Sequence, residues 1–292
     1  MKIGLQANPR NPRALKLGQR LVERVAGRAD LVVSDENGAI GTDLPHQPLG
    51  EMRPDVVVAI GGDGTFLYTL GRTSAPVLPI NAGTIGVLAE VAAERPAVLD
   101  AALERLLSGF YHLEERMKLG ADLAGRPLPD ATNEYVVHAD HPGKMGVFEV
   151  AFDGEVTGRI RADGVIVATP TGSTAYSLSS FGPIVDPGLD ALILTAIAPF
   201  RAEARAIVVE PLHTLRLRNL LPGRSALTIA DGQSEFAMAP DTALTVYRSP
   251  RRATFVRFGS TFIDRLRGKR ILPWSEDANS GGGDHADVPP PP

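Results

Sequence analysis

Hydrophobic positions in the first third of the chain fall into short apolar runs separated by helical stripes. Short runs rich in β-branched residues are typical of buried strands. We expect strands at residues 2–5, 31–33, 56–60 and 76–80. Apolar positions at helical spacing predict helices at 14–26 and 95–110, whereas 35–53 reads as loop with at most one short helix. Strands alternating with helices predict a doubly wound α/β domain with a parallel sheet.

The pattern changes near Leu113, after which strand-like segments predominate. Asp153-Gly154 between two alternating runs predicts a hairpin. Further strands are expected at 165–168, 213–218, 227–229, 243–247 and 255–258, with a short helix at 261–268. We therefore predict an α/β, Rossmann-like N-terminal domain at 1–113, to which 255–274 return, and a mostly β C-terminal domain at 114–254. The polar, Gly- and Pro-rich tail, 275–292, is expected to be disordered.

Composition narrows the class of protein. The chain has 292 residues, of which 43% are hydrophobic, enough for one large or two ordinary cores. Its net charge of −4 provides no global basic field for nucleic acid. It has no cysteine, which excludes thiol catalysis and fits a reducing compartment. No stretch is apolar enough to span a bilayer. We expect a cytoplasmic protein without nucleic-acid or membrane partners.

A glycine-rich turn, Gly61-Gly62-Asp63-Gly64-Thr65, joins the expected strand at 56–60 to a helical segment. A strand, a glycine turn and a helix N-terminus together form an anion site, because free N–H groups point at the ligand. A carboxylate there repels phosphate. Asp63 is best explained if it accepts a proton from a nucleophile or helps to hold a cation. The alternative is an ordinary tight turn in which Asp63 caps the helix.

A second informative run covers residues 161–177, where the strand at 165–168 leads into Thr169-Pro170-Thr171-Gly172-Ser173-Thr174. We expect a helix to begin near Thr174. A turn this dense in hydroxyls and glycine can bind hydroxylated and phosphorylated groups without a cationic side chain. An ordinary Ser/Thr-rich turn with caps is the alternative.

Both runs resemble motifs of the NAD kinases, and the glycine turn is shared more broadly with lipid kinases and phosphofructokinase. Three more segments agree: Thr132-Asn133-Glu134, Asp231-Gly232-Gln233 and, more loosely, residues 81–86. All five follow the family's order. The chain departs from the family at Pro79 and Val87, where Gly and Phe are usual, and at Phe200, where the family often has histidine.

The resemblance implies the two-domain NAD kinase fold and an ATP-dependent kinase. Such an enzyme phosphorylates the 2′-hydroxyl of the adenosine ribose of NAD to give NADP, with ATP or polyphosphate as donor. Asp63 would be the general base, and Asn133 and Glu134 would hold the ribose. The other residues implied to bind nucleotide or substrate are Gly61, Gly62, Gly64, Thr65, Asn81, Lys144, Arg161, Asp163, Thr174, Ala175, Tyr176, Ser177, Leu178, Ser179 and Gln233.

The resemblance further implies Mg²⁺ with few direct protein ligands, and a homodimer or homotetramer. Two other functions stay open on the residues alone. A lipid kinase of the same superfamily would share the Asp63 turn but lack Asn133-Glu134 and the 161–179 run. A non-catalytic dinucleotide-sensing module would have no need of Asp63.

Overall fold

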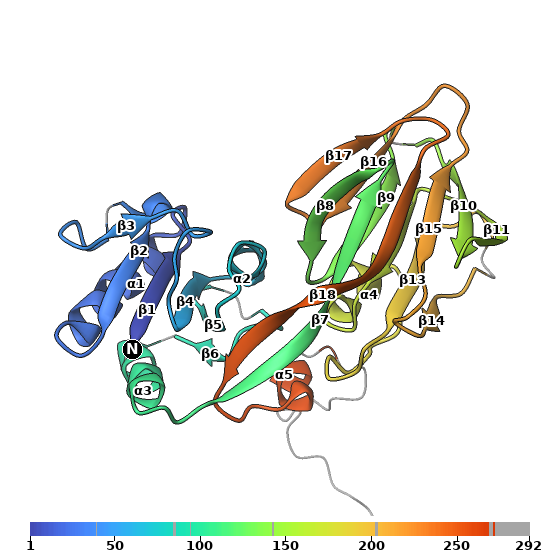
Figure 1. Ribbon diagram of the computed structural model, residues 1–292. Coiled ribbons are helices and arrows are strands. Elements are labelled where there is room, and N and C mark those ends of the chain that lie inside the picture. The colour runs from blue at the N-terminus through green and yellow to red at the C-terminus, as the bar shows by residue number, and fades with distance from the viewer. Residues whose placement is uncertain are drawn as a thin grey trace, which may run out of the picture.

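The computed structural model describes residues 1–38, 40–83, 86–93, 95–141, 143–201, 204–268 and 271. The tail expected to be disordered therefore lies outside the described residues. The chain forms an α/β half and a β half joined by a long two-stranded ribbon (Figure 1). No helix of the described part is long and apolar enough to cross a membrane.

The α/β half is built on a parallel sheet in the order β3-β2-β1-β4-β5, with β6 paired to β5. Its strands are β1 Lys2–Ala7, β2 Asp30–Ser34, β3 His46–Gln47, β4 Val56–Gly61, β5 Val77–Asn81 and β6 Val91–Ala92. Helices α1 Pro12–Val25 and α3 Pro96–Leu107 pack on one face, and α2 Asp63–Leu70 packs on the other. The parallel α/β domain predicted from the sequence is confirmed.

Local sequence sets the bounds of these helices. The Asn11 side chain accepts hydrogen bonds from the N–H groups of Arg13 and Ala14 at 2.9 and 3.3 Å, and Pro12 occupies the first helical position. The helix predicted from residue 14 therefore begins at Pro12. The loop predicted at 35–53 contains one 3₁₀ turn, Asp35–Asn37, and the short strand β3.

The β half consists of two packed sheets, in the orders β11-β10-β15-β18-β7-β8 and β14-β13-β12-β9-β16-β17. Its strands are β7 His112–Leu123, β8 Arg126–Ala131, β9 Glu134–Ala139, β10 Gly146–Phe152, β11 Glu155–Ala162, β12 Gly164–Ala168, β13 Leu192–Ile197, β14 Ile207–Val209, β15 Leu215–Asn219, β16 Ala226–Ala230, β17 Ser234–Met238 and β18 Ala243–Arg257. The hairpin predicted at Asp153-Gly154 joins β10 to β11, and both turn residues have positive φ.

One sequence-based prediction is wrong in this half. The strands expected at 243–247 and 255–258 are one strand, β18, with an irregularity between Arg248 and Arg252. The helix expected to begin near Thr174 is present but short: a 3₁₀ turn, Gly172–Thr174, precedes the single turn α4 Tyr176–Ser179. Hydroxyl side chains that bond the nearby backbone compete with helix formation and keep this segment short.

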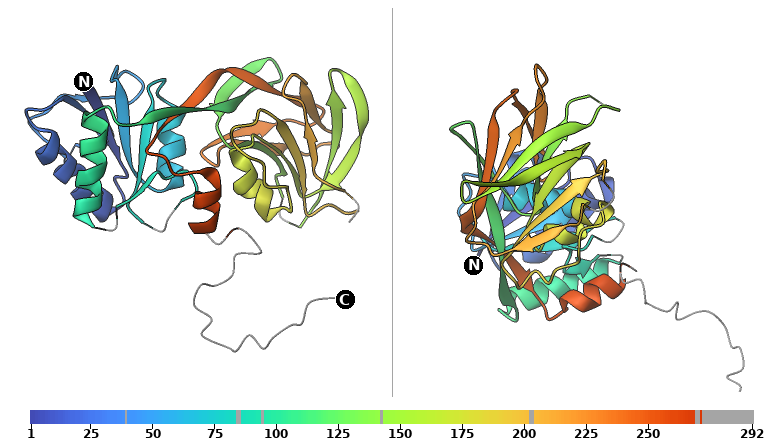
Figure 2. Two further views of the ribbon diagram at one scale, coloured as in Figure 1. Left: turned by 90° about the horizontal axis from the view of Figure 1, so that it is seen from below. Right: turned by 90° about the vertical axis from the view of Figure 1, so that its right-hand side faces the viewer.

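Strands β7 and β18 pair antiparallel along most of their length and connect the two halves (Figure 2). Near its end β18 also joins the parallel sheet, where Phe255 pairs with Val77 of β5. After β18 the short helix α5 Phe262–Gly268 packs beside the ribbon. The glycine turn after β4 and the loops of the β half therefore face each other across the base of the ribbon.

Candidate active site

The glycine turn connects β4 to α2. Gly61 ends the strand, and Gly62 is the N-cap of α2 in an extended conformation. A Cβ on Gly61 would overlap the side chain of Thr65, so this position requires glycine. Gly62 contributes no capping side chain, and its carbonyl accepts hydrogen bonds from the N–H groups of Thr65 and Phe66 at 2.9 and 3.2 Å. Asp63 is the first helical residue and does not occupy the cap position.

The carboxylate of Asp63 is held by the chain that follows β5. The N–H of Val87 donates to Oδ2 at 2.9 Å, and the N–H of Leu88 lies 3.4 Å from Oδ1. A Cβ on Gly86 would overlap this carboxylate. Asp63 is half-buried and thus oriented by backbone that lies more than twenty residues further along the chain.

A hydrogen bond ties the glycine turn to the β half. Gln233 lies in the turn between β16 and β17, and its Nε2 donates to the carbonyl of Gly64 at 2.8 Å. Two residues earlier, Asp231 accepts hydrogen bonds from the N–H groups of Thr132, Asn133 and Glu134 at 2.8, 2.7 and 3.2 Å. Three of the predicted motifs thus meet at one place.

Asn133 and Glu134 are buried and not fully paired. Within the described residues, Asn133 Oδ1 and Glu134 Oε2 have no hydrogen-bond partner. Burial raises the pKa of Glu134 to about 8, and the negative charge of Asp231 adds to the shift. Burial also raises the pKa of Asp231, although the three backbone N–H groups lower it. Buried polar atoms left without a partner are suited to a ligand that supplies one, such as a vicinal diol.

The hydroxyl-rich turn after β12 packs directly on this pair. Thr169 donates from its N–H to the carbonyl of Asn133 at 2.8 Å and from its hydroxyl to the carbonyl of Thr132 at 2.6 Å. A Cβ on Gly172 would overlap the Asn133 carbonyl, so only glycine allows this approach. The turn and the Asn-Glu segment are therefore one structural unit.

The predicted residues of the 174–179 segment differ in accessibility. Thr174, Ala175 and Leu178 are half-buried, whereas Tyr176 and Ser179 are exposed. Ser177 is fully buried, and its hydroxyl lies 3.0 Å from that of Thr195. Ser177 therefore supports the turn from beneath.

Asn81 ends β5 and pairs with Gly61 across the sheet. It is buried, and its Oδ1 accepts a hydrogen bond from the N–H of Gly83 at 2.9 Å. Its Nδ2 has no partner among the described residues. The predicted turn after β5 is present, and it lies directly beside the glycine turn. Thr84 and Ile85 of this motif lie outside the described residues.

A pocket of about 610 Å³ opens beside the glycine turn. It is lined by Gln6, Asn8, Pro9, Arg10, Glu36, Gly62, Gly64, Thr65, Tyr68, Arg72 and Gln233. Its size suits a nucleotide-sized ligand. Arg10 brings a positive charge that the sequence interpretation missed. The sequence did hold a clue to Arg10, because it lies three residues after the end of β1, and ligands of parallel sheets bind at the carboxyl ends of the strands.

Lys144, Arg161 and Asp163 form a second group, away from the glycine turn. Arg161 lies on β11 and Asp163 just before β12, whereas Thr169 follows the other end of β12. At about 3.3 Å per residue, Asp163 and Thr169 are roughly 20 Å apart. Lys144 is exposed in the loop before β10.

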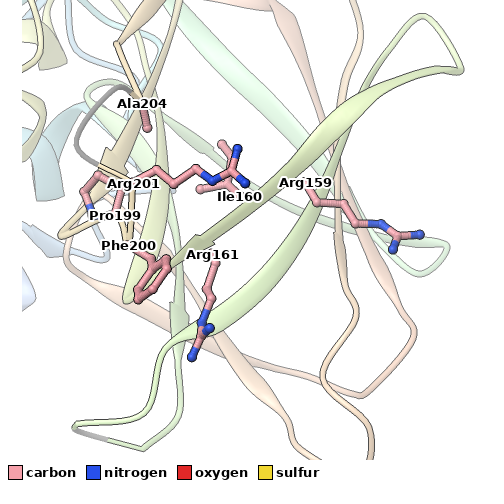
Figure 3. Close-up of a pocket in the computed structure, with 7 residues that line it drawn as sticks. All are labelled: Arg159, Ile160, Arg161, Pro199, Phe200, Arg201 and Ala204. Atoms are coloured by element: carbon pink, nitrogen blue, oxygen red, sulfur yellow. The ribbon is translucent and has the colours of Figure 1, made fainter.

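Arg161 belongs to a large surface pocket of about 1060 Å³ that also includes Arg159, Phe200 and Arg201 (Figure 3). Its guanidinium lies 4.7 Å from the centroid of the Phe200 ring. Phe200 stands where the family often has histidine, so this departure is in contact with a predicted site residue.

The α/β half places an acid in a glycine turn at a helix N-terminus, beside a nucleotide-sized pocket and hydrogen-bonded to the β half. This arrangement is that of a nucleotide-dependent phosphotransferase. The model of the ATP-NAD kinase N-terminal domain matches residues 3–111, and that of the C-terminal domain matches residues 132–258. The chain belongs to the ATP-NAD kinase family. It is an enzyme that phosphorylates NAD to NADP using ATP.

Curated relatives agree. The chain is 39% identical over 266 residues to an NAD kinase of Thermococcus kodakarensis, covering 88% of this chain and 94% of that protein. It is 36% identical over 279 residues to an NAD kinase of Methanothermobacter thermautotrophicus, covering 93% and 96%.

Solved structures share the fold. Yeast NADH kinase complexed with NADH superposes with a TM-score of 0.84 at 21% identity, covering 95% of this chain and 89% of that chain. An NAD kinase from Archaeoglobus fulgidus in complex with ATP has a TM-score of 0.74 at 26% identity, covering 93% of this chain and all of that one.

Proposed function

We propose that Asp63 is the general base of the kinase reaction and accepts the proton of the ribose 2′-hydroxyl as the new O–P bond forms. A sugar hydroxyl keeps its proton at neutral pH, so a fixed carboxylate assists its attack. The observation that carries this proposal is the position of Asp63. It lies on the first turn of α2, at the N-terminus of the helix, and is oriented by the N–H of Val87.

Asn133 and Glu134 would bind the adenosine ribose, because their unpaired buried oxygens suit sugar hydroxyls. Gly61, Gly62 and Gly64 would let backbone N–H groups meet phosphate oxygens, and Thr65 would line the same site, with ATP in the adjoining pocket. Asn81, the Thr174, Ala175, Tyr176, Ser177, Leu178 and Ser179 segment and Gln233 would complete the nucleotide site. Such positioning lowers the barrier by converting a bimolecular encounter into an oriented one.

Mg²⁺ would accompany the triphosphate. In the described part of the chain, no three His, Asp or Glu side chains gather into a group that could hold a metal ion. This donor set fits a cation that keeps its waters and binds mainly through phosphate oxygens. The cation would screen the charge of the triphosphate.

A homodimer or homotetramer is proposed as the assembly. Strand β14 is at the edge of its sheet, and Ile207 and Val208 on it are exposed. Exposed apolar edges favour association. Lys144, Arg161 and Asp163, which lie far from the glycine turn, would contribute to dinucleotide binding from this side of the β half.

The division into residues 1–113 with 255–274 and residues 114–254 also remains our proposal. The second part would be the dinucleotide-binding domain. The absence of cysteine supports a cytoplasmic location.

The decisive experiment measures NADP formation by the purified protein with NAD, ATP and Mg²⁺, beside the Asp63→Asn variant. We expect the substitution to lower turnover by two to four orders of magnitude, the range of general-base catalysis. Asp43→Asn, on an exposed loop, is the matched control and should retain activity. Near-normal turnover in a folded Asp63→Asn protein would reject the assignment. Replacing ATP by polyphosphate in the same assay tests the donor.

A further inference from the structure

A separate pocket of about 490 Å³ lies where the C-terminal end of α2 meets the β7–β18 ribbon. It is lined by Gly50, Met52, Arg53, Leu70, Gly71, Arg72, Thr73, Ser74, Lys118, Arg251, Arg252 and Thr254. Five of these residues are basic and none is acidic. The pocket draws on both halves of the molecule, because 50–74 belong to the α/β half and the others to the ribbon.

Lys118 of β7 is the buried cation of this pocket. Lys118 is only 5% exposed. Its Nζ donates a hydrogen bond of 2.9 Å to the carbonyl of Leu70, the last residue of α2. An ammonium group has three N–H donors, so this bond uses one of them. Burial lowers the pKa of Lys118, although Asp130 and Asp231 oppose the shift. A negatively charged ligand would compensate the desolvated charge.

Two arginines of β18 are fixed in place beside Lys118. Arg251 Nε donates to Asp130 at 2.8 Å, and Arg252 forms two bonds of 2.7 Å with Asp190. These pairs orient the two guanidinium groups and neutralise their charge. They form a rigid wall for the pocket.

The remaining cations are held by contacts other than ion pairs. Arg53 donates to the carbonyls of Gly50 and Met52 at 2.9 and 2.7 Å, and Arg72 lies 3.6 Å from the centroid of the Tyr68 ring. Within the described residues, neither Arg53, Arg72 nor Lys118 forms an ion pair with a carboxylate. The lining of the pocket therefore carries five cationic side chains and no carboxylate, although Asp130 and Asp231 act on Lys118 from outside the lining.

We propose that this pocket binds a small phosphorylated anion of the pyrophosphate class, which carries at least two negative charges. Guanidinium groups and hydroxyls such as those of Thr73 and Ser74 are suitable donors for phosphate oxygens. The site lies at the opposite end of α2 from the phosphate turn of the kinase reaction, about 12 Å away for an eight-residue helix, and Arg72 lines both pockets. A bound anion would connect α2 to the ribbon.

The test is calorimetric titration of inorganic pyrophosphate into the full chain, with a non-hydrolysable ATP analogue present in excess to occupy the reaction's own phosphate site. We expect saturable binding, weakened about tenfold or more by Arg53→Ser, which removes one charged donor. Ser74→Glu, which places a carboxylate at the exposed edge of the pocket, should weaken it similarly. Inorganic phosphate, which has fewer charges, should bind more weakly than pyrophosphate.

Arg216→Ser is the matched control, because Arg216 is an exposed arginine of β15 outside this pocket. It should leave the affinity unchanged. Equal affinity in wild type, Arg53→Ser and Ser74→Glu would overturn the proposal, and so would the absence of binding at millimolar pyrophosphate. Because the readout is binding, it does not depend on Asp63 or on turnover.

Discussion

The carboxylate of Asp63 occupies the space that a side chain on Gly86 would need. The two residues are in different βα segments, yet Gly86 also begins the Gly86-Val87-Leu88 backbone that donates to this carboxylate. Gly86 is therefore a steric determinant of where the proposed base points.

Gly86→Ala should displace the Asp63 carboxylate and lower kcat about 100-fold, because a shift of about 1 Å in a catalytic group can have this effect. The KM for NAD should change much less, since the ribose-binding pair is untouched. Gly158→Ala is the control, because a Cβ there meets nothing within 4 Å and its φ is not positive. Steady-state kinetics on both variants check the prediction. An unchanged kcat in Gly86→Ala would show that the carboxylate need not be held there.

Gln233→Ala removes the hydrogen bond from Gln233 to the Gly64 carbonyl. We expect kcat/KM to fall about fivefold, which corresponds to about 1 kcal/mol for one hydrogen bond. Gln233→Glu should be worse, because it replaces the donor by a negative charge beside the phosphate turn. Gln19→Ala on α1 serves as control. If Gln233→Ala had the same kcat/KM as the wild type, the hydrogen bond between Gln233 and Gly64 would have no role in turnover.

The folded state should lose stability as pH rises because of Glu134. Its pKa is raised from 4.5 to about 8 by burial, so the native state keeps a proton that the unfolded state has released. The stabilisation is complete below about pH 4.5 and is lost as pH rises through about 8, with a slope of at most about 1.4 kcal/mol per pH unit. Urea unfolding of wild type and Glu134→Gln between pH 5 and 9 checks this. The wild type should lose stability relative to Glu134→Gln as pH rises, because glutamine stays uncharged, and a pH-independent difference between the two proteins would contradict the prediction.

Arg257 is 1% exposed and donates to Glu114 at 2.5 Å and to the Leu88 carbonyl at 3.0 Å. Arg257→Gln should destabilise the protein by about 3–5 kcal/mol, because it breaks the buried ion pairs with Glu90 and Glu114. Arg20→Gln breaks the more exposed pair with Asp100 and should destabilise the protein much less, because solvent screens that pair. Denaturant unfolding gives both values. If the two variants lost the same free energy of unfolding, the buried ion pairs of Arg257 would stabilise the protein no more than the exposed pair of Arg20.

Local sequence was enough to predict the parts of the site but not how they are held. The strand–glycine–helix unit around Asp63 and the hairpin at Asp153-Gly154 follow from short-range patterns, and both are confirmed. The contact of Gly86 with Asp63 joins residues 23 positions apart. No local periodicity encodes such a contact.

Strand β7 was not predicted as a separate element, for a related reason. Its inward positions include Arg116 and Lys118, which are buried but charged, so the apolar alternation of a half-buried strand is hidden. The charges are tolerated because Arg116 contacts Glu114 and Lys118 bonds the end of α2. The contact between Lys118 and the end of α2 joins residues far apart in the sequence, so only the folded structure reveals it.

The pairing of β7 with β18 has a mechanical consequence. In the described part of the chain, the backbone passes between the halves only along these two strands, which are bonded to each other as they cross. Any change in the relative orientation of the two halves would then have to bend or twist a hydrogen-bonded two-stranded ribbon, and could not occur by rotation about a single flexible loop.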